Sequence, residues 1–121
     1  MGVPMRKSRV IPPPEECPLK MCMNFLGGAW TPNILWYLRA GPRRFSELKS
    51  DLDGVSSKVL SARLKDLEDS GVIERSVMQT SPPTVEYRLS DLGEELQPAI
   101  SAIVDVGHRL KRIRARRLTN R

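Results

Sequence analysis

One stretch of the chain, residues 45 to 75, constrains the fold more than any other. Its sequence, FSELKSDLDGVSSKVLSARLKDLEDSGVIER, predicts a short helix, a tight turn, a longer helix and the beginning of a strand. Asp53 and Gly54 form the turn dipeptide, and Gly71 ends the longer helix. This order of elements is typical of a winged helix-turn-helix, whose second helix enters the major groove of DNA.

The longer helix is predicted to have one apolar and one polar face. We expect Ser56 or Ser57 to cap it. At about 100° per residue, Leu60, Leu64 and Leu67 share one side. The polar face carries small, hydroxylated or positive residues near its start: Ser57, Lys58, Ser61, Ala62 and Lys65. This start favours contact with phosphates and bases, although a plain surface helix shows a similar pattern.

Two runs of alternating residues follow, at 72–77 and 84–89, with a turn-prone loop at 78–83. They predict a two-stranded wing. Ser90 then begins a long helix with an acidic residue in its first turn. Its apolar stripe is Leu92, Leu96, Ile100, Ile103, Val106 and Leu110. A stripe of about five turns needs a covering surface, and a second copy of the chain is the simplest one.

The N-terminal part is predicted to contain an arm and two helices. Residues 1–14 form a Pro-rich basic arm that excludes helix. A helix is expected over residues 18–26, ended by two glycines. Thr31 is the expected N-cap of the next helix, with Pro32 at its first position and Gly41 beyond its end. The predicted fold is therefore α+β and mainly α.

Composition bounds the class of protein. The 121 residues suit one domain, and 28% charged with 40% apolar residues is an ordinary globular composition. No apolar run approaches the roughly 20 residues that span a bilayer, and no apolar segment follows the basic N-terminus. We expect a cytoplasmic domain over residues 15–110, between the arm and a basic tail at 111–121.

The net charge of +6 is concentrated in that tail. No acidic residue follows Asp105, and the remaining 14 basic residues equal the 14 acidic ones. The tail's basic residues are Lys111, Arg112, Arg114, Arg116, Arg117 and Arg121. A cationic tail favours polyanions through counterion release, but it also suits a solvated helix end, and both interpretations stay open.

No metal site, cofactor or enzymatic centre is expected. The two cysteines, Cys17 and Cys22, are too few for a zinc site with the single histidine, His108, and a reducing cytosol argues against a disulfide framework. The chain shows no paired carboxylates, nucleophile–base set or phosphate-binding loop.

Five segments, taken in order, resemble the HxlR-type regulators, a winged-helix family of transcription factors related to the MarR type. They are CP at 17–18, LGGAWT at 26–31, GPRRFSEL at 41–48, SKVLSARLKDL at 57–67 and VEYRLSDLG at 85–93. The resemblance implies a homodimer, built from the N- and C-terminal helices, that binds an inverted-repeat operator on double-stranded DNA. It implies repression more often than activation.

In some members of that family the cysteine before Pro senses electrophiles or oxidants, a role that would fall on Cys17. Its place beside a helix start favours the thiolate, and an inert buried thiol is the alternative. The wing departs from the family pattern because residues 79–84 contain no Lys or Arg. Ala62 limits base contact at its position to apolar groups such as a thymine methyl.

The predicted site residues follow from these patterns. Those for DNA binding are Arg43, Arg44, Ser56, Ser57, Lys58, Ser61, Ala62, Arg63, Lys65, Arg75, Thr80, Ser81 and Arg88. Those for the dimer interface are Leu19, Phe25, Leu96, Ile100, Ile103, Val106 and Leu110. We expect Arg43 and Arg44 to clamp phosphates and Arg63 to lie between the two helix faces. The two copies would contact half-sites about 10 or 20 base pairs apart.

Two other functions remain possible from the sequence. One is a regulator that responds to a small molecule bound near Trp30, Trp36 and Tyr37, although core or interface packing is the simpler role for these aromatics. The effector itself is unknown. The other is a protein-interaction module that uses the winged helix without DNA.

Overall fold

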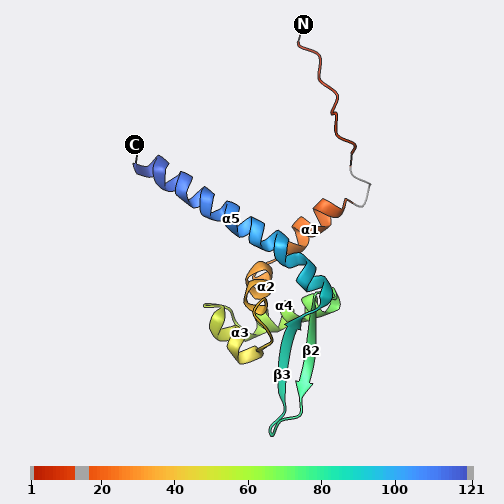
Figure 1. Cartoon of the computed structure of the whole chain (residues 1–121), viewed down its shortest axis with the longest axis vertical. Helices are drawn as coiled ribbons and strands as arrows, with labels where there is room; N and C mark the ends of the chain where they lie inside the picture. Colours follow the sequence, from red (N-terminus) through yellow and green to blue (C-terminus); the bar gives the residue numbers. More distant parts are fainter. Residues whose placement is uncertain (1, 13–16, 120–121) are drawn as a thin grey trace.

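The computed structural model describes residues 2–12 and 17–119 and shows the predicted winged helix-turn-helix (Figure 1). Its elements are α1 (Pro18–Leu26), α2 (Thr31–Leu38), β1 (Arg43–Arg44), α3 (Phe45–Asp51), α4 (Ser57–Asp69), β2 (Ile73–Met78), β3 (Thr84–Leu89) and α5 (Asp91–Thr119). Residues 2–12 of the predicted arm carry no helix or strand. Pro13 and Pro14 of the arm, and Arg121 of the tail, lie outside the described residues.

The core forms where the apolar faces of α2, α3, α4 and α5 meet the sheet. Leu60, Leu64 and Leu67 of α4 are buried, which confirms the apolar face predicted from their spacing. Ile34 and Leu35 of α2 are fully buried against them. Burying each such side chain stabilises the fold by about 1.5–3 kcal/mol, so α4 is held firmly by one face and leaves the other exposed.

The wing is part of a three-stranded antiparallel sheet in the order β1-β3-β2. Strands β2 and β3 match the predicted hairpin, with Ile73 opposite Leu89. Strand β1 was not predicted, because two consecutive arginines show no alternation of apolar and polar residues. It pairs Arg43 with Tyr87, so its strand conformation depends on a distant partner. The two-stranded wing therefore gains a third strand at its base.

The start of α2 differs from the prediction. Thr31 is the first helical residue, and Trp30 occupies the N-cap position with a left-handed φ of 69°. The Thr31 N–H donates to the carbonyl of Gly28, so the chain turns through the glycine pair before the helix begins. Thr31 is buried. A bulky residue in this backbone conformation is uncommon. The sequence therefore predicted Thr31 as the N-cap, with Pro32 as the first helical residue.

Helix α5 begins as predicted and runs to Thr119 without a break at residue 110. The Gly93 N–H donates to Ser90 Oγ at 3.2 Å, and the Ser90 hydroxyl donates to the carbonyl of Gly71. Ile100 is only 3% exposed and belongs to the core of the single chain. Its side chain therefore packs in the core of its own chain and is not exposed for a partner as the dimer prediction expected. Across the described ranges, no helix combines the length and apolar character needed to cross a membrane.

Candidate nucleic-acid interface

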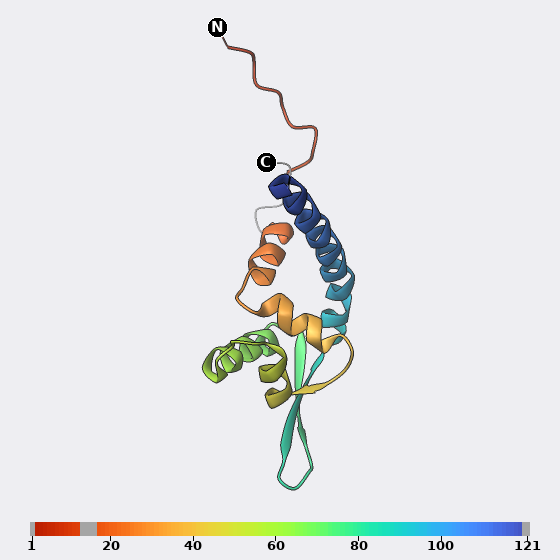
Figure 2. The same cartoon turned by 90° about the vertical axis from the view of Figure 1, so that its left-hand side faces the viewer.

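The exposed face of α4 brings five predicted contact residues together. Ser57, Lys58, Ser61, Ala62 and Lys65 are all exposed on the side away from the core. Ser61 and Lys65 share a surface hollow with Arg75 and Tyr87 of the wing, and Figure 2 shows α4 near the base of the β2–β3 hairpin. This arrangement depends on the buried leucines, which fix the rotation of the helix about its axis. The result is a ridge of short and positive side chains supported by a rigid scaffold.

The N-terminus of α4 is capped by Ser56. Its Oγ accepts the backbone N–H of Val59 at 3.1 Å, which satisfies one of the N–H groups left free at a helix start. Other N–H groups of the first turn point out of the helix end, where the helix dipole favours an anion. Ser56 itself is exposed, so both the cap and the helix end are accessible to a phosphate.

A surface hollow of about 420 Å³ joins α4 to the sheet. Ser61, Lys65, Glu68 and Asp69 line it from α4, and Arg75 and Tyr87 line it from the wing. Arg75 thus joins Lys65 at this hollow, where Glu68 and Asp69 balance the two positive charges. The two carboxylates lie toward the C-terminal end of α4, so the positive part of this surface is the end nearer the helix start.

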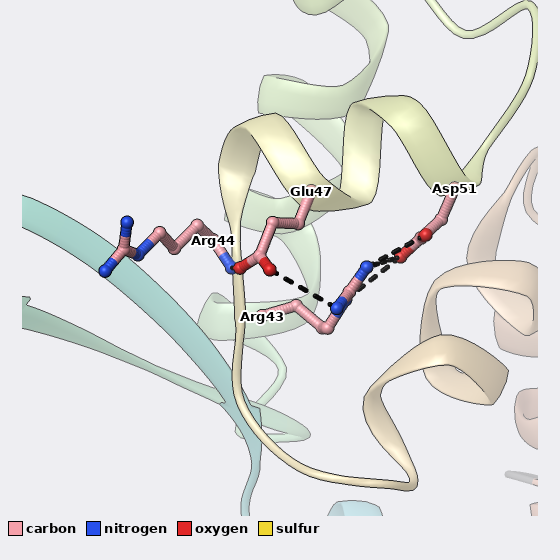
Figure 3. Close-up of polar contacts among 4 residues, drawn as sticks. All are labelled: Arg43, Arg44, Glu47 and Asp51. Carbon is pink, nitrogen blue, oxygen red and sulfur yellow. Dashed lines mark hydrogen bonds and ion pairs between the residues drawn. The ribbon is translucent and has the colours of Figure 1, made fainter.

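The two arginines before α3 are used differently. Arg43 Nη2 donates to Asp51 Oδ2 at 2.7 Å, and its Nη1 lies 3.3 Å from Glu47 Oε2 (Figure 3). The hydrogen bond to Asp51 raises the pKa of Arg43 above its ordinary value. Arg43 therefore ties β1 to α3 rather than standing free for a phosphate. Arg44 is exposed, and Figure 3 shows its guanidinium pointing away from these carboxylates.

Two further predicted arginines also form ion pairs. Arg63 is partly buried and lies 3.2 Å from Asp66 on the next turn of α4. Arg88 of β3 lies 2.9 Å from Glu74 of β2. Both members of the wing pair are about half exposed, and exposed pairs contribute only about 0–1 kcal/mol. Arg88 can exchange Glu74 for a phosphate at little cost, whereas Arg63 is held along the flank of α4.

The wing tip offers hydroxyl groups and no positive charge. The Thr80 hydroxyl donates to the carbonyl of Pro82 at 2.7 Å, so it already braces the loop. Ser81 is exposed. The tip can accept or donate single hydrogen bonds to a backbone, but it cannot neutralise a phosphate.

Sequence reasoning missed two features of this surface. Val59 is 37% exposed on α4, next to Lys58, where an apolar group could meet a thymine methyl. The exposure of Val59 could have been predicted from its position outside the stripe of Leu60, Leu64 and Leu67. The clamp on Arg43 was also missed, although Glu47 and Asp51 follow it at intervals of four and eight residues.

The predicted redox residue lies at the N-cap of α1. Cys17 is partly buried there and its side chain does not cap the helix, whereas Cys22 is exposed within α1. Helix α1 contains no buried residue, and Leu19 is 64% exposed. Only Phe25 and Leu26 of α1 pack against the core. The helix is therefore largely uncovered in the single chain.

The outer side of α5 is apolar and open. Ile103, Val106 and Leu110 are each about half exposed and line a shallow hollow with Gly107. A second cavity of about 460 Å³ lies between α2 and α5. Trp36 and Tyr37 line it, together with His108. Trp30, which the sequence grouped with these aromatics, packs against the core and is not among the lining residues.

Comparison with known proteins agrees with this geometry. The HxlR-like helix-turn-helix family model matches residues 25–114. The chain is 35% identical over 97 residues to YdeP, a helix-turn-helix-type transcriptional regulator of Bacillus subtilis strain 168, covering 80% of this chain and 76% of YdeP.

Solved structures show the same fold. A MarR-family regulator from Porphyromonas gingivalis W83 superposes with a TM-score of 0.73 and 36% identity, covering 85% of this chain and 97% of that one. The redox regulator HypR in its reduced form superposes with a TM-score of 0.75 and 26% identity, covering 79% and 95%. The family is one of transcriptional regulators rather than enzymes. The chain therefore belongs to the HxlR-like helix-turn-helix family, whose DNA-binding fold is related to that of the MarR family.

Proposed function

We propose that this chain is a dimeric, sequence-specific transcriptional regulator that reads an inverted-repeat operator with the exposed face of α4. The observation that carries this proposal is the set of accessible side chains on α4, namely Ser57, Lys58, Ser61, Ala62 and Lys65, which lies opposite the buried leucines. Lys58 and Lys65 supply charge for phosphates or guanine edges, and the serines donate to base edges.

Contacts around α4 set its register on the duplex. Exposed Arg44 and the hollow-lining Arg75 lie on the two strands that flank β3, and we propose both as phosphate contacts beside α4. Arg43 acts by holding α3 against β1, so its contribution is to position the motif. Arg88 becomes available once it leaves Glu74. Phosphate contacts of this kind orient a protein without reading sequence, which leaves specificity to α4.

Dimerisation would join the uncovered faces of α1 and α5. Leu19 on α1 and Ile103, Val106 and Leu110 on α5 are exposed apolar side chains that a monomer leaves in water. A two-fold axis would repeat each contact and present two copies of α4 to two half-sites. Occupation of an operator by this dimer would block transcription, which makes repression the favoured sign of regulation.

Cys17 is proposed as an oxidant or electrophile sensor within this dimer. It lies at the N-cap of α1, whose apolar side chains are exposed, so modification of its thiol would disturb the helix proposed to join the subunits. The similarity to the redox regulator HypR supports this assignment.

The cavity between α2 and α5 favours a second candidate, regulation by a small apolar ligand. Trp36 and Tyr37 offer aromatic surface, and His108 offers a polar group at the same cavity. Sites of this size with few polar groups are typical of small-molecule binding. This candidate would be favoured over the thiol switch by two results together. A ligand would raise the melting temperature of the chain, and diamide would leave its DNA binding unchanged.

Selection of bound fragments from genomic DNA tests the proposal. The native dimer is expected to enrich fragments that share an inverted repeat with half-sites about 10 or 20 base pairs apart. On such a fragment, Lys58→Ala is expected to weaken binding in gel-shift titrations. Lys20→Ala removes the same charge from exposed α1 and, once light scattering shows that it has kept the native mass, should bind as the native chain does. Equal affinity of Lys58→Ala and the native chain would refute the assignment of α4.

A further inference from the structure

The last turns of α5 carry charge that the family match covers only in part. The match ends at residue 114, whereas the helix continues to Thr119. No acidic residue lies between residues 109 and 119. The basic residues of this segment are all exposed: Arg109, Lys111, Arg112, Arg114, Arg116 and Arg117.

Three of these arginines form a row on one side of the helix. At about 100° per residue, Arg109, Arg112 and Arg116 fall within about 60° of one another. They line one shallow hollow together with Ile113. The helix rises about 10 Å from the first to the third. Within the part of the chain that the structure describes, none of them takes part in an ion pair.

The row lies far from the surface proposed to read the operator. Figures 1 and 2 both show α5 leaving the domain and ending on the side opposite the tip of the β2–β3 hairpin. A polyanion bound along the end of α5 is therefore a different stretch from the one that α4 and the wing of the same chain would contact.

The chemistry of the segment favours duplex DNA as that polyanion. Single strands are held by stacking on aromatic rings, and residues 109–119 contain no Phe, Trp or Tyr. A helix that lies in a membrane surface needs a broad apolar face, but Arg117 interrupts the stripe that continues from Leu110 and Ile113. Arginines spaced along a straight helix suit the regular phosphates of a duplex, which they can bind bidentately.

We propose that the row formed by Arg109, Arg112 and Arg116 is a second duplex-DNA contact. It binds the phosphate backbone of a DNA segment other than the operator segment bound by α4. This contact reads no sequence, and it goes beyond the proposed function because it lets one protein hold two DNA segments.

The test compares two triple variants of the full chain with equal charge. The row variant carries Arg109→Gln, Arg112→Gln and Arg116→Gln, and the control carries Lys111→Gln, Arg114→Gln and Arg117→Gln. Binding to a random-sequence duplex is measured across a salt series. Three lost phosphate contacts should reduce the slope of log affinity against log salt by about 2.7 in the row variant. The control should keep nearly the native slope.

A capture assay then tests whether the protein binds two DNA segments at the same time. Protein bound to a duplex on beads is offered a second, fluorescent duplex, and the native chain and the control should retain it while the row variant does not. Equal losses in both variants, no loss in either, or dissociation of the row variant into monomers would overturn the proposal. Preferential binding of duplex RNA or an acidic peptide through the row would also overturn it. Lys58→Ala should keep the row-dependent binding, so a failure of the α4 assignment is distinguishable from a failure of the row.

Discussion

Gly93 tests how α5 is joined to the wing. Gly93 is buried in the first turn of α5, and a methyl group added there would collide with the carbonyl oxygen of Val72. It would also approach Leu89 Cδ2 at 3.1 Å. The Val72 carbonyl accepts the Ser90 N–H at 3.0 Å, so any shift of this strand end weakens that hydrogen bond at the start of α5.

The size of the effect of Gly93→Ala follows from opposing contributions. Alanine favours a helix over glycine by about 1 kcal/mol. Overpacking costs about 1–3 kcal/mol, and loss of a backbone hydrogen bond costs about 1 kcal/mol more. We expect a net loss of about 1–3 kcal/mol in the free energy of unfolding. The measurement is urea unfolding followed by circular dichroism at one fixed protein concentration, because the proposed dimerisation would link stability to concentration.

Gly107→Ala is the matched control in the same helix. Apart from the chain neighbours of Gly107 and the helix's own backbone, no described atom lies within 4 Å of the methyl that it adds. Because Gly107 lines the hollow proposed to join two copies, both glycine variants are compared in the Ile103→Asp chain, where helix propensity alone should raise the stability of Gly107→Ala by about 0.5–1 kcal/mol. If Gly93→Ala unfolds at the same or a higher urea concentration than Gly107→Ala, the close packing of α5 on the end of the wing is refuted.

Three further predictions concern the cap, the interface and the thiol. Ser56→Ala removes the N-cap of α4 and should lower the free energy of unfolding by about 1 kcal/mol in the same urea assay; an unchanged midpoint would contradict the cap. Ile103→Asp should shift the proposed dimer toward monomer in light scattering. Ile100→Val should lower the free energy of unfolding by about 0.5–1.5 kcal/mol and leave the mass unchanged. A dimeric Ile103→Asp would place the interface elsewhere. Diamide is reduced as it joins two thiols in a disulfide, so it should couple the Cys17 thiols of the two copies. It should therefore release DNA from the native chain and from Cys22→Ser but not from Cys17→Ser, and equal release from all three would remove Cys17 as the switch.

Local periodicity was enough to predict the parts of the fold that depend on neighbours in sequence. The leucines of α4 and the Ser90 cap of α5 follow from residues within one or two helical turns. The hairpin strands followed from alternation and a turn-prone loop. Strand β1 did not, because its two residues are a strand only through pairing with Tyr87 and Glu86.

The errors share one physical origin: a sequence pattern shows that a side chain needs a contact, but it does not show which part of the folded protein provides that contact. The stripe on α5 is apolar along its length, yet Ile100 faces the core of its own chain while Ile103 stays half exposed. Arg43 looks like a free cation in sequence, but the approach of β1 to α3 places it beside Asp51. Trp30 likewise has a left-handed backbone, which its own preference does not predict, and its side chain packs against the core.

Affinity cleavage from α4 tests the central proposal most directly. Ser61→Cys, in a chain that also carries Cys17→Ser and Cys22→Ser, provides one thiol on the exposed face of α4 for attachment of an iron chelator that cleaves nearby DNA. On a selected operator, we expect cleavage to cluster within both halves of the inverted repeat. A chelator at exposed Glu95→Cys on α5 should leave those positions uncut. Cleavage from Ser61→Cys that is absent, or no different from that of Glu95→Cys, would contradict placement of α4 in the major groove.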